Sequence, residues 1–348
     1  MEQHGGLFSM PHDMDNVIDF SSNVIPGGPP PKVAAALRSA LADAEKYPDP
    51  ESKKMKKCLA LYMRVPTNTI AVGNGATDII YRFCSYVLSK NTHVCVTNPT
   101  FSEYESASSL AGHRVTKFTG INIGRDLEKF SKAMPKNGCV FVCNPNNPTG
   151  ELLEIKDILY LADMAKSKSS ILFVDESFIE LVPGKNRSVV TFAPKRKNLF
   201  VLRSLTKSFA IPGIRVGYCV TNKNMADIVN CTSMPWNVSV LAQRATCAAV
   251  SSHKKHLAWA RQLIKTESEF LQKNINKIDG YKCVQNPSSN FILVHSKLNS
   301  HVIWKKLLRH KILVRDCTSF GNVCCNHIRI AIKTRTENKK LLEALKSI

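Results

Sequence analysis

Residues 202–209 read Leu-Arg-Ser-Leu-Thr-Lys-Ser-Phe, and they overlap the end of a short apolar run at 199–203. Gly-Ile-Arg follows at 213–215. A lysine after a strand, flanked by hydroxyl side chains and with an arginine eight residues on, suits a phosphate site. It equally suits a Schiff-base lysine, whose amine must be accessible and deprotonated. The candidate residues of this stretch are Ser204, Thr206, Lys207 and Arg215.

Three other segments place polar residues just after or beside a predicted strand. Residues 72–78 read Val-Gly-Asn-Gly-Ala-Thr-Asp, in which the glycines let the backbone approach a ligand. Residues 143–150 read Cys-Asn-Pro-Asn-Asn-Pro-Thr-Gly, an elaborate turn. Residues 173–178 read Phe-Val-Asp-Glu-Ser-Phe, where Asp175 ends an apolar strand and needs a partner such as a protonated pyridine nitrogen. Each segment alone also fits an ordinary turn, loop or surface acid.

Short apolar runs recur along the chain and predict the strands of a buried sheet. They are rich in Val, Ile, Phe and Cys, and they lie at 93–97, 139–143, 170–174, 199–203 and 215–220. Helical patterns lie between several of them. Continuous apolar runs indicate strands that are buried on both faces. Because strands alternate with helices, we expect an α/β fold with a mostly parallel sheet, where ligands lie beyond the carboxyl ends of strands.

The chain is expected to divide into a large domain, a small domain and an N-terminal arm. Residues 1–45 form the arm and a helix that joins the small domain, and residues 46–238 form the large domain. Residues 239–348 form a small α+β domain, in which an amphipathic stretch at 253–277 precedes several short strands.

Composition excludes several classes of function. The 348 residues carry 48 Lys and Arg against 27 Asp and Glu, a formal net charge of +21. The basic residues are scattered and not interleaved with aromatics, so we expect anionic small substrates and no nucleic-acid partner. No apolar run approaches the ~18 residues of a membrane helix. The 12 cysteines include no CxxC pair, so we expect no metal site and a cytoplasmic protein with reduced thiols.

In their order along the chain, the four segments resemble the fold-type I, aspartate-aminotransferase-like family of pyridoxal-phosphate enzymes. The resemblance implies pyridoxal 5'-phosphate as cofactor, carried on Lys207 as a Schiff base. Asp175 would pair with the pyridinium nitrogen and strengthen the ring as an electron sink. Asn147 would bond the ring 3-oxygen, and Tyr104 would stack on the ring. The remaining cofactor contacts would come from Gly75, Ala76, Thr77, Phe178, Ser204, Thr206 and Arg215.

Within this family the chain resembles the threonine-phosphate decarboxylases of cobalamin synthesis, whose near relatives are the histidinol-phosphate aminotransferases. The likeness lies in Asp-Phe-Ser-Ser-Asn at 19–23, Met-Pro-Trp-Asn-Val-Ser at 234–239 and Ile-Leu-Val-Arg-Asp-Cys at 312–317. Phe178 also belongs to it, because aminotransferases of this fold usually have a tyrosine there. A phenylalanine cannot donate a hydrogen bond to the ring oxygen.

This likeness implies decarboxylation of L-threonine O-3-phosphate to (R)-1-aminopropan-2-ol O-phosphate, with Lys207 returning a proton to the α-carbon. Two alternatives stay open: histidinol-phosphate aminotransfer, and decarboxylation of serine phosphate. A third, a cofactor-binding regulatory protein, is suggested only by the charge. The likeness also implies a homodimer whose site is completed across the interface by Tyr47 and the N-terminal arm. The expected substrate-binding residues are His4, Asn23, Asn147, Arg315 and Arg329.

Overall fold

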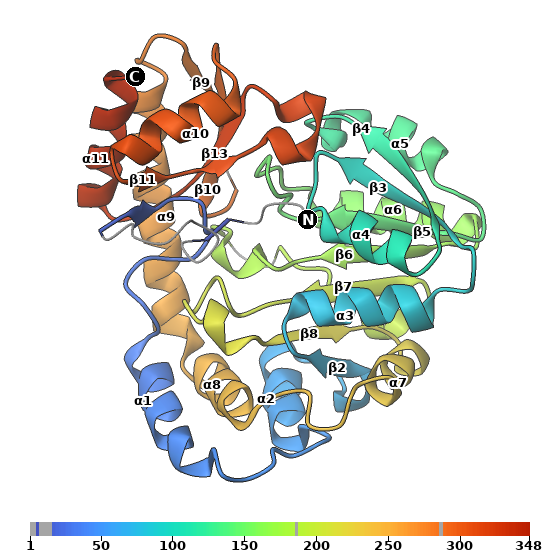
Figure 1. The fold of residues 1–348 in the computed structure, drawn as a ribbon. Coiled ribbons are helices and arrows are strands. Elements are labelled where there is room, and N and C mark those ends of the chain that lie inside the picture. The colour runs from blue at the N-terminus through green and yellow to red at the C-terminus, as the bar shows by residue number, and fades with distance from the viewer. Residues whose placement is uncertain (1–4, 7–15, 185–186, 285–287) are drawn as a thin grey trace.

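A seven-stranded sheet runs through the larger part of the molecule (Figure 1). The computed structural model describes residues 5–6, 16–184, 187–284 and 288–348. The strand order is β2-β8-β7-β6-β5-β3-β4, and neighbouring strands are parallel except where β8 runs antiparallel to β2 and β7. This confirms the expected α/β class. The strands are β2 (Ile70–Gly73), β3 (His93–Asn98), β4 (Arg114–Thr119), β5 (Cys139–Cys143), β6 (Ile171–Asp175), β7 (Leu199–Arg203) and β8 (Gly217–Val220).

Burial explains which strands the sequence predicted. The predicted apolar runs correspond to β3, β5, β6, β7 and β8. Every residue of β5 and β7 is buried. The edge strand β4 is largely polar and partly exposed, and it therefore gives no apolar signal. The start of β8 lies two residues later than expected, because Arg215 takes a left-handed conformation with φ of 54°.

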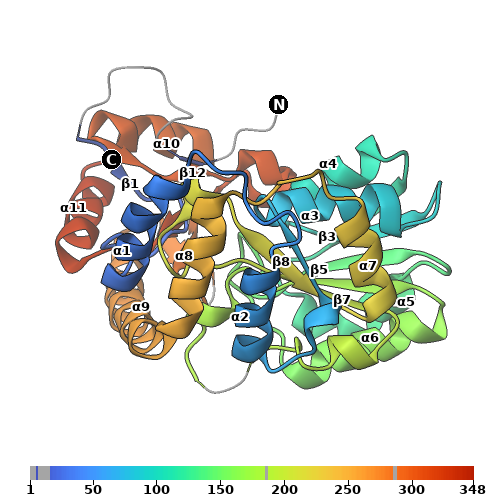
Figure 2. The same ribbon diagram turned by 90° about the horizontal axis from the view of Figure 1, so that it is seen from below.

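Helices cover both faces of the sheet (Figure 2). One face carries α3 (Ala76–Arg82), α4 (Glu103–Leu110) and α7 (Lys223–Cys231). The other carries α2 (Lys53–Met63), α5 (Leu127–Ala133), α6 (Ile155–Ser167) and α8 (Val240–Ser251). The two apolar cores take alternate residues of the same strands, for example Phe141 on the first face and Val140 on the second. This is the pleat expected of a doubly covered sheet.

The small domain is built on a four-stranded antiparallel sheet of order β12-β13-β10-β9. The short strands β1 and β11 pair in parallel, so the first described strand of the chain joins this domain. The elements are β1 (Ile18–Asp19), α9 (His253–Ile275), β9 (Tyr281–Cys283), β10 (Phe291–Ser296), α10 (Ser300–Arg309), β11 (Ile312–Leu313), β12 (Arg315–Asp316), β13 (His327–Ala331) and α11 (Arg335–Lys346).

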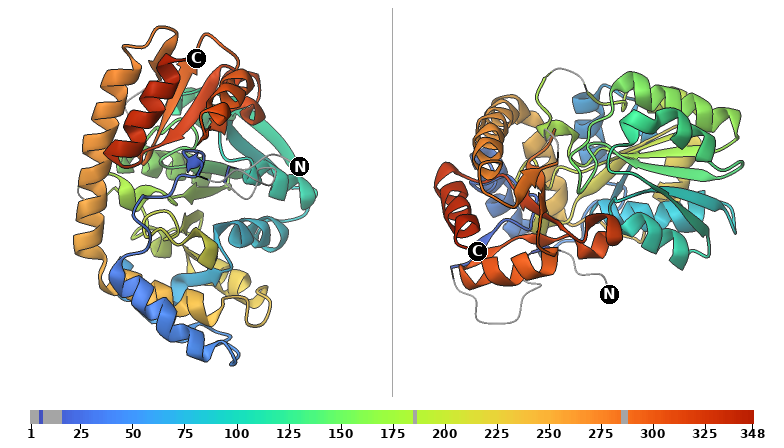
Figure 3. Two further views of the ribbon diagram at one scale, coloured as in Figure 1. Left: turned by 60° about the vertical axis from the view of Figure 1, so that its left-hand side comes forward. Right: turned by 90° about the horizontal axis from the view of Figure 1, so that it is seen from above.

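The boundary between the two cores lies inside α9, not at residue 239 as expected. Leu257 packs with the large core, whereas Ala260 packs with the small one. Helix α1 (Pro31–Ala40) was expected to join the small domain, but its Val33 packs with the large core, alongside α8. The long helix α9 consequently runs from the large domain to the small one (Figure 3). The spacing of apolar residues reveals a helix but not which of two cores receives it.

None of the described helices is long and apolar enough to cross a membrane.

Candidate active site

A pocket at the carboxyl ends of β5, β6 and β7 brings together most of the residues that the sequence singled out. Phe101, Cys143 and Ser177 also line it, although they were not chosen as site residues; Cys143 and Ser177 lie in the motifs at 143–150 and 173–178, and Phe101 lies three residues before Tyr104. The position agrees with the rule for open α/β sheets. The lining residues are Ala76, Thr77, Phe101, Tyr104, Cys143, Asn147, Asp175, Ser177, Phe178, Ser204, Thr206, Lys207 and Arg215.

Lys207 projects into this pocket from the turn after β7. Its Nζ donates to Thr206 Oγ1 at 3.1 Å. Burial lowers the pKa of Lys207, and Arg215 lowers it further, whereas Asp175 acts in the opposite direction. Because the neutral amine is the nucleophilic form, this environment suits a lysine that bonds covalently to a carbonyl compound.

Asp175 is a buried carboxylate at the end of β6, 4% exposed. Its Oδ1 accepts from the backbone N–H of Ser177 at 2.8 Å, and its Oδ2 accepts from the hydroxyl of Tyr104 at 2.7 Å. Neither of these donors is a cation. A buried carboxylate is costly without one, so a cationic ring nitrogen in the pocket would supply the missing charge. The donor set therefore fits a pyridinium group.

Another part of the pocket suits a phosphate group. Gly75 has φ of +90°, and a Cβ there would lie 2.5 Å from Nη2 of Arg215. A Cβ on Gly217 would lie 2.4 Å from the backbone nitrogen of Ala76. Ser204 Oγ and Thr206 Oγ1 are 2.8 Å apart. Backbone N–H groups, two hydroxyls and a guanidinium group around one cavity suit a phosphate group.

Tyr104 does not have the position expected of it. Its hydroxyl bonds Asp175, and its ring stacks on Phe141 with the centroids 5.1 Å apart and the planes at 16°. It is 0% exposed, so its ring is packed into the core at the wall of the pocket. Phe101 is partly exposed and lines the pocket, edge-on to Tyr104 at 5.6 Å. Phe101 is therefore better placed than Tyr104 to stack on a ring in the pocket.

Arg329 and Asn147 come together although they are far apart in the sequence. Arg329 Nη1 donates to Asn147 Oδ1 at 2.5 Å, and Nη2 donates to the carbonyl oxygen of Ser21. Its Nε lacks a hydrogen-bond partner among the residues that the structure describes. Burial lowers the pKa of Arg329 to about 9, and Arg315 contributes to the shift. Both effects make an anionic ligand favourable beside this guanidinium group.

The N-terminal segment contacts both this arginine and the backbone of Lys207. Ser21 bonds Arg329, and the backbone N–H of Ile25 donates to the carbonyl oxygen of Lys207 at 3.2 Å. Asn23 lies between them, 7% exposed, and its Oδ1 has no hydrogen-bond partner among the described residues. The unsatisfied atom is an acceptor, so a contact to a substrate phosphate would come from the Nδ2 amide group of Asn23, and it stays a prediction.

Of two other residues expected at the site, one is not described by the structure and the other lies elsewhere. His4 falls outside the described residues. Tyr47 does not line the pocket of its own chain: it is 80% exposed and lies against Trp236, with the ring centroids 4.5 Å apart. An exposed aromatic pair of this kind is typical of a surface that contacts another chain.

A buried ionic network behind the pocket fixes the two loops that carry Asp175 and Lys207. Arg203 at the end of β7 bonds Glu176 at 3.1 Å and Glu180 at 3.0 Å. Glu180 in turn accepts from the hydroxyl of Ser208 at 2.6 Å. Glu176 follows Asp175 and Ser208 follows Lys207 in sequence, so the network joins the two turns. Glu176 sits in the motif at 173–178, but the sequence does not show that it pairs with Arg203.

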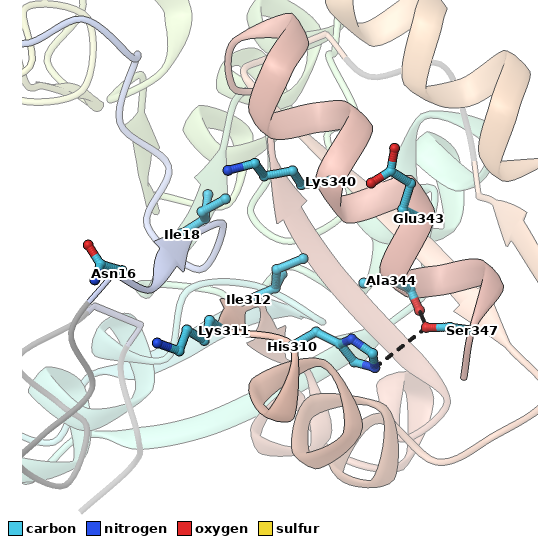
Figure 4. Close-up of a pocket in the computed structure, with 9 residues that line it drawn as sticks. All are labelled: Asn16, Ile18, His310, Lys311, Ile312, Lys340, Glu343, Ala344 and Ser347. Carbon is cyan, nitrogen blue, oxygen red and sulfur yellow. Dashed lines mark hydrogen bonds between the residues drawn. The ribbon is translucent and has the colours of Figure 1, made fainter.

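A second hollow lies on the small domain, between the β1–β11 pair and α11 (Figure 4). Lys311 and Lys340 stand at its rim, and His310 approaches Ser347 at 3.5 Å. None of the residues chosen from the sequence lines it. It is also remote from the carboxyl ends of the large sheet, so we place the active site in the first pocket.

Comparison with known proteins gives a consistent family. The family model described as aminotransferase class I and II matches residues 15–345. A histidinol-phosphate aminotransferase from Caldanaerobacter subterraneus subsp. tengcongensis is 33% identical over 87% of this chain and 84% of its own length. A threonine-phosphate decarboxylase from Salmonella typhimurium is 31% identical over 96% of this chain and 92% of its own.

A solved structure supports the same grouping. The L-threonine-O-3-phosphate decarboxylase from Porphyromonas gingivalis has a TM-score of 0.84 and 26% identity, covering 94% of this chain and 98% of that chain. Relatives with two different activities are thus about equally similar to this chain.

Proposed function

Because this chain belongs to the class I and II aminotransferase family, whose members depend on pyridoxal phosphate, we propose that it decarboxylates L-threonine O-3-phosphate. The product would be (R)-1-aminopropan-2-ol O-phosphate, a building block of the cobalamin nucleotide loop. The family and its cofactor follow from the comparisons. The choice of reaction and substrate is our proposal, supported by the residues around Arg329 and Phe178.

The pocket offers a partner for each polar part of the cofactor. Lys207 would hold its aldehyde carbon and Asp175 its ring nitrogen. Asn147 would donate to its ring oxygen, because the amide oxygen of Asn147 is already taken by Arg329. When bound, pyridoxal phosphate stabilises negative charge at the substrate's α-carbon, and the bond that breaks there is the one perpendicular to the ring.

The substrate's orientation therefore decides the reaction, and two arginines would set it. Arg315 and Arg329 pair across β12 and β13, so their side chains share one face of the small sheet. Two adjacent guanidinium groups suit a doubly charged phosphate, which accepts bidentate hydrogen bonds. If they hold the phosphate, the substrate carboxylate is left free to stand perpendicular to the ring and leave as carbon dioxide.

Phe178 is the observation that most favours decarboxylation over aminotransfer. It lines the pocket and packs edge-on against Phe291, with the centroids 5.1 Å apart. It brings no hydroxyl to the ring oxygen, where aminotransferases of this fold usually place one. Lys207, with its lowered pKa, would then act as the acid that returns a proton to the α-carbon.

A side-by-side assay tests the proposal. The purified protein with pyridoxal phosphate is given L-threonine O-3-phosphate, L-serine O-phosphate, or histidinol phosphate with 2-oxoglutarate. We expect carbon dioxide from the threonine compound with the highest kcat/KM of the three. Glutamate formation from 2-oxoglutarate, without carbon dioxide, would establish aminotransfer instead. A higher kcat/KM for serine phosphate, with release of carbon dioxide, would change the proposed substrate but not the proposed reaction.

We further propose that two chains form the active unit, with the Tyr47–Trp236 surface at the interface. Mixing two inactive variants tests this. One carries Lys207→Ala and the other Tyr47→Ala, and in a hybrid dimer with shared sites one site regains both residues. Activity should reappear on mixing. No recovery, together with a monomer mass in solution, would contradict a shared site.

A further inference from the structure

The hydroxyl of Tyr104 is directed at Asp175, the carboxylate that would pair with the cofactor's ring nitrogen. It donates to Asp175 Oδ2 at 2.7 Å, from a side chain that is 0% exposed. The ring of Tyr104 is held by Phe141 on its face and by Phe101 at an edge. These contacts leave the hydroxyl little freedom, so the bond to Asp175 is fixed by packing in the core.

Tyr104 can act on Asp175 only as a donor. Burial raises the pKa of Tyr104 well above its usual value, and the negative charge of Asp175 raises it further. The phenol therefore keeps its proton. A neutral hydroxyl that donates to a carboxylate stabilises the ionised form of that carboxylate. The backbone N–H of Ser177 adds a second such bond at 2.8 Å.

The other groups around Asp175 do not replace this effect. Cys143 lines the same pocket, and burial raises its pKa, so it too is neutral. Lys207 lines the pocket, but it would be bonded to the cofactor's aldehyde carbon and so would not donate to Asp175. Burial also lowers the pKa of Lys207. Among the described residues, the Tyr104 hydroxyl and the Ser177 N–H are the hydrogen-bond donors found on the Asp175 carboxylate oxygens.

We propose that Tyr104 is a positioning residue that keeps Asp175 ionised, and that it thereby holds the proton on the cofactor's ring nitrogen. The proton between a carboxylate and a pyridine can reside on either group. A donor on the carboxylate favours the ion pair, and the ion pair is the form in which the ring withdraws electrons most strongly. The inference rests on the family's cofactor and holds for decarboxylation and aminotransfer alike.

The ring nitrogen itself gives the test. The chain is reconstituted with pyridoxal phosphate labelled with ¹⁵N in the ring, and the nitrogen resonance is recorded for the unmodified protein and for Tyr104→Phe. We expect a protonated nitrogen in the unmodified protein and a shift towards the unprotonated value in Tyr104→Phe. An unchanged resonance in Tyr104→Phe would overturn the proposal. This readout does not depend on which substrate the enzyme uses.

Tyr62→Phe is the matched control. It also removes a tyrosine hydroxyl bonded to a carboxylate, Glu180 at 3.1 Å, but that carboxylate lies in the ionic network behind the pocket. Its nitrogen resonance should equal that of the unmodified protein. An equal shift in both variants would show a general packing effect and overturn a specific role for Tyr104.

Steady-state kinetics distinguish a role of Tyr104 in positioning Asp175 from a role in folding alone. Tyr104→Phe should lower kcat about 10-fold or more, because it removes a hydrogen bond to a charged group, while KM changes little. If Tyr104→Phe does not fold, the unmodified chain decides. The NMR signals of its Tyr104 ring are recorded twice, once with the normal cofactor bound and once with an analogue that has carbon in place of the ring nitrogen. They should differ, and identical signals would overturn the proposal.

Discussion

Arg315 and Arg329 lie directly opposite each other on the antiparallel strands β12 and β13. Both are buried, at 8% and 6% exposure. Arg329 lies over the ring of Phe291 at 5.7 Å, and Arg315 over the ring of Phe320 at 5.5 Å. Two like charges held this close oppose each other unless an anion lies between them. The pair therefore supports the proposal that the substrate carries an anionic group.

Arg329→Lys keeps the charge but loses the planar group that bonds Asn147 and Ser21. We expect KM for the phosphorylated substrate to rise about 10- to 100-fold, since hydrogen bonds to charged groups are worth about 1.5–3 kcal/mol. Steady-state kinetics measure this. Arg309→Lys, at an exposed position near the end of α10, is the control and should leave KM unchanged. Equal effects of the two substitutions would argue against a local role.

Gly217→Ala should weaken binding of the cofactor phosphate. The added Cβ would clash with the backbone of Gly75 and Ala76. That backbone cannot move without displacing the turn that would hold the cofactor phosphate. Equilibrium titration with pyridoxal phosphate should show an increase in Kd. Gly213→Ala adds a methyl group in the same segment, with nothing within 4 Å of its Cβ. Its Kd should match that of the unmodified protein. A similar increase in Kd in both variants would contradict a specific role of Gly217 in forming the phosphate site.

Phe178→Tyr returns a hydroxyl to the position that aminotransferases of this fold use. A hydroxyl donating to the cofactor's ring oxygen stabilises its anion, so the pH midpoint of the visible absorbance change of the bound cofactor should fall. Spectrophotometric titration measures that midpoint. Phe178→Leu removes the ring without adding a donor and should not lower it. If Phe178→Tyr leaves the midpoint in place, the side chain does not face the ring oxygen.

His327 links folding stability to pH. Burial lowers the pKa of His327 to about 4, and the neighbouring His295 contributes. An unfolded chain binds this proton near pH 6.5, so between the two values the unfolded state holds more protons and stability falls as pH falls. The loss should reach about 3 kcal/mol by pH 4. Urea unfolding of His327→Gln should lack this loss, whereas the exposed His310→Gln should retain it.

The sequence predicted the central sheet and most of the pocket because both depend on short-range patterns. Strands such as β5 and β7 are continuous apolar runs, and the motifs beside them carry Asp175 and Lys207. The edge strand β4 lacks such a run, because one side of it faces solvent. The place of α8 in the large core depends on packing between distant segments, which periodicity does not encode.

The positions of Phe101 and Tyr104 show the same limit within the site. They are three residues apart: Tyr104 lies in the first turn of α4, and Phe101 lies just before that helix begins. The sequence places two aromatic residues near the pocket. It does not show which of them has an exposed ring at the pocket and which donates a hydrogen bond to Asp175. That distinction depends on Phe141 from β5, which stacks on Tyr104.

The carboxyl carbon of the substrate tests the central claim most directly. L-Threonine O-3-phosphate labelled with ¹³C at the carboxylate is incubated with the reconstituted protein in a sealed tube and followed by NMR. Decarboxylation predicts that the label leaves the carboxylate signal and appears as bicarbonate and carbon dioxide. A label that stays in a carboxylate, while the amino group is lost to 2-oxoglutarate, would contradict the account.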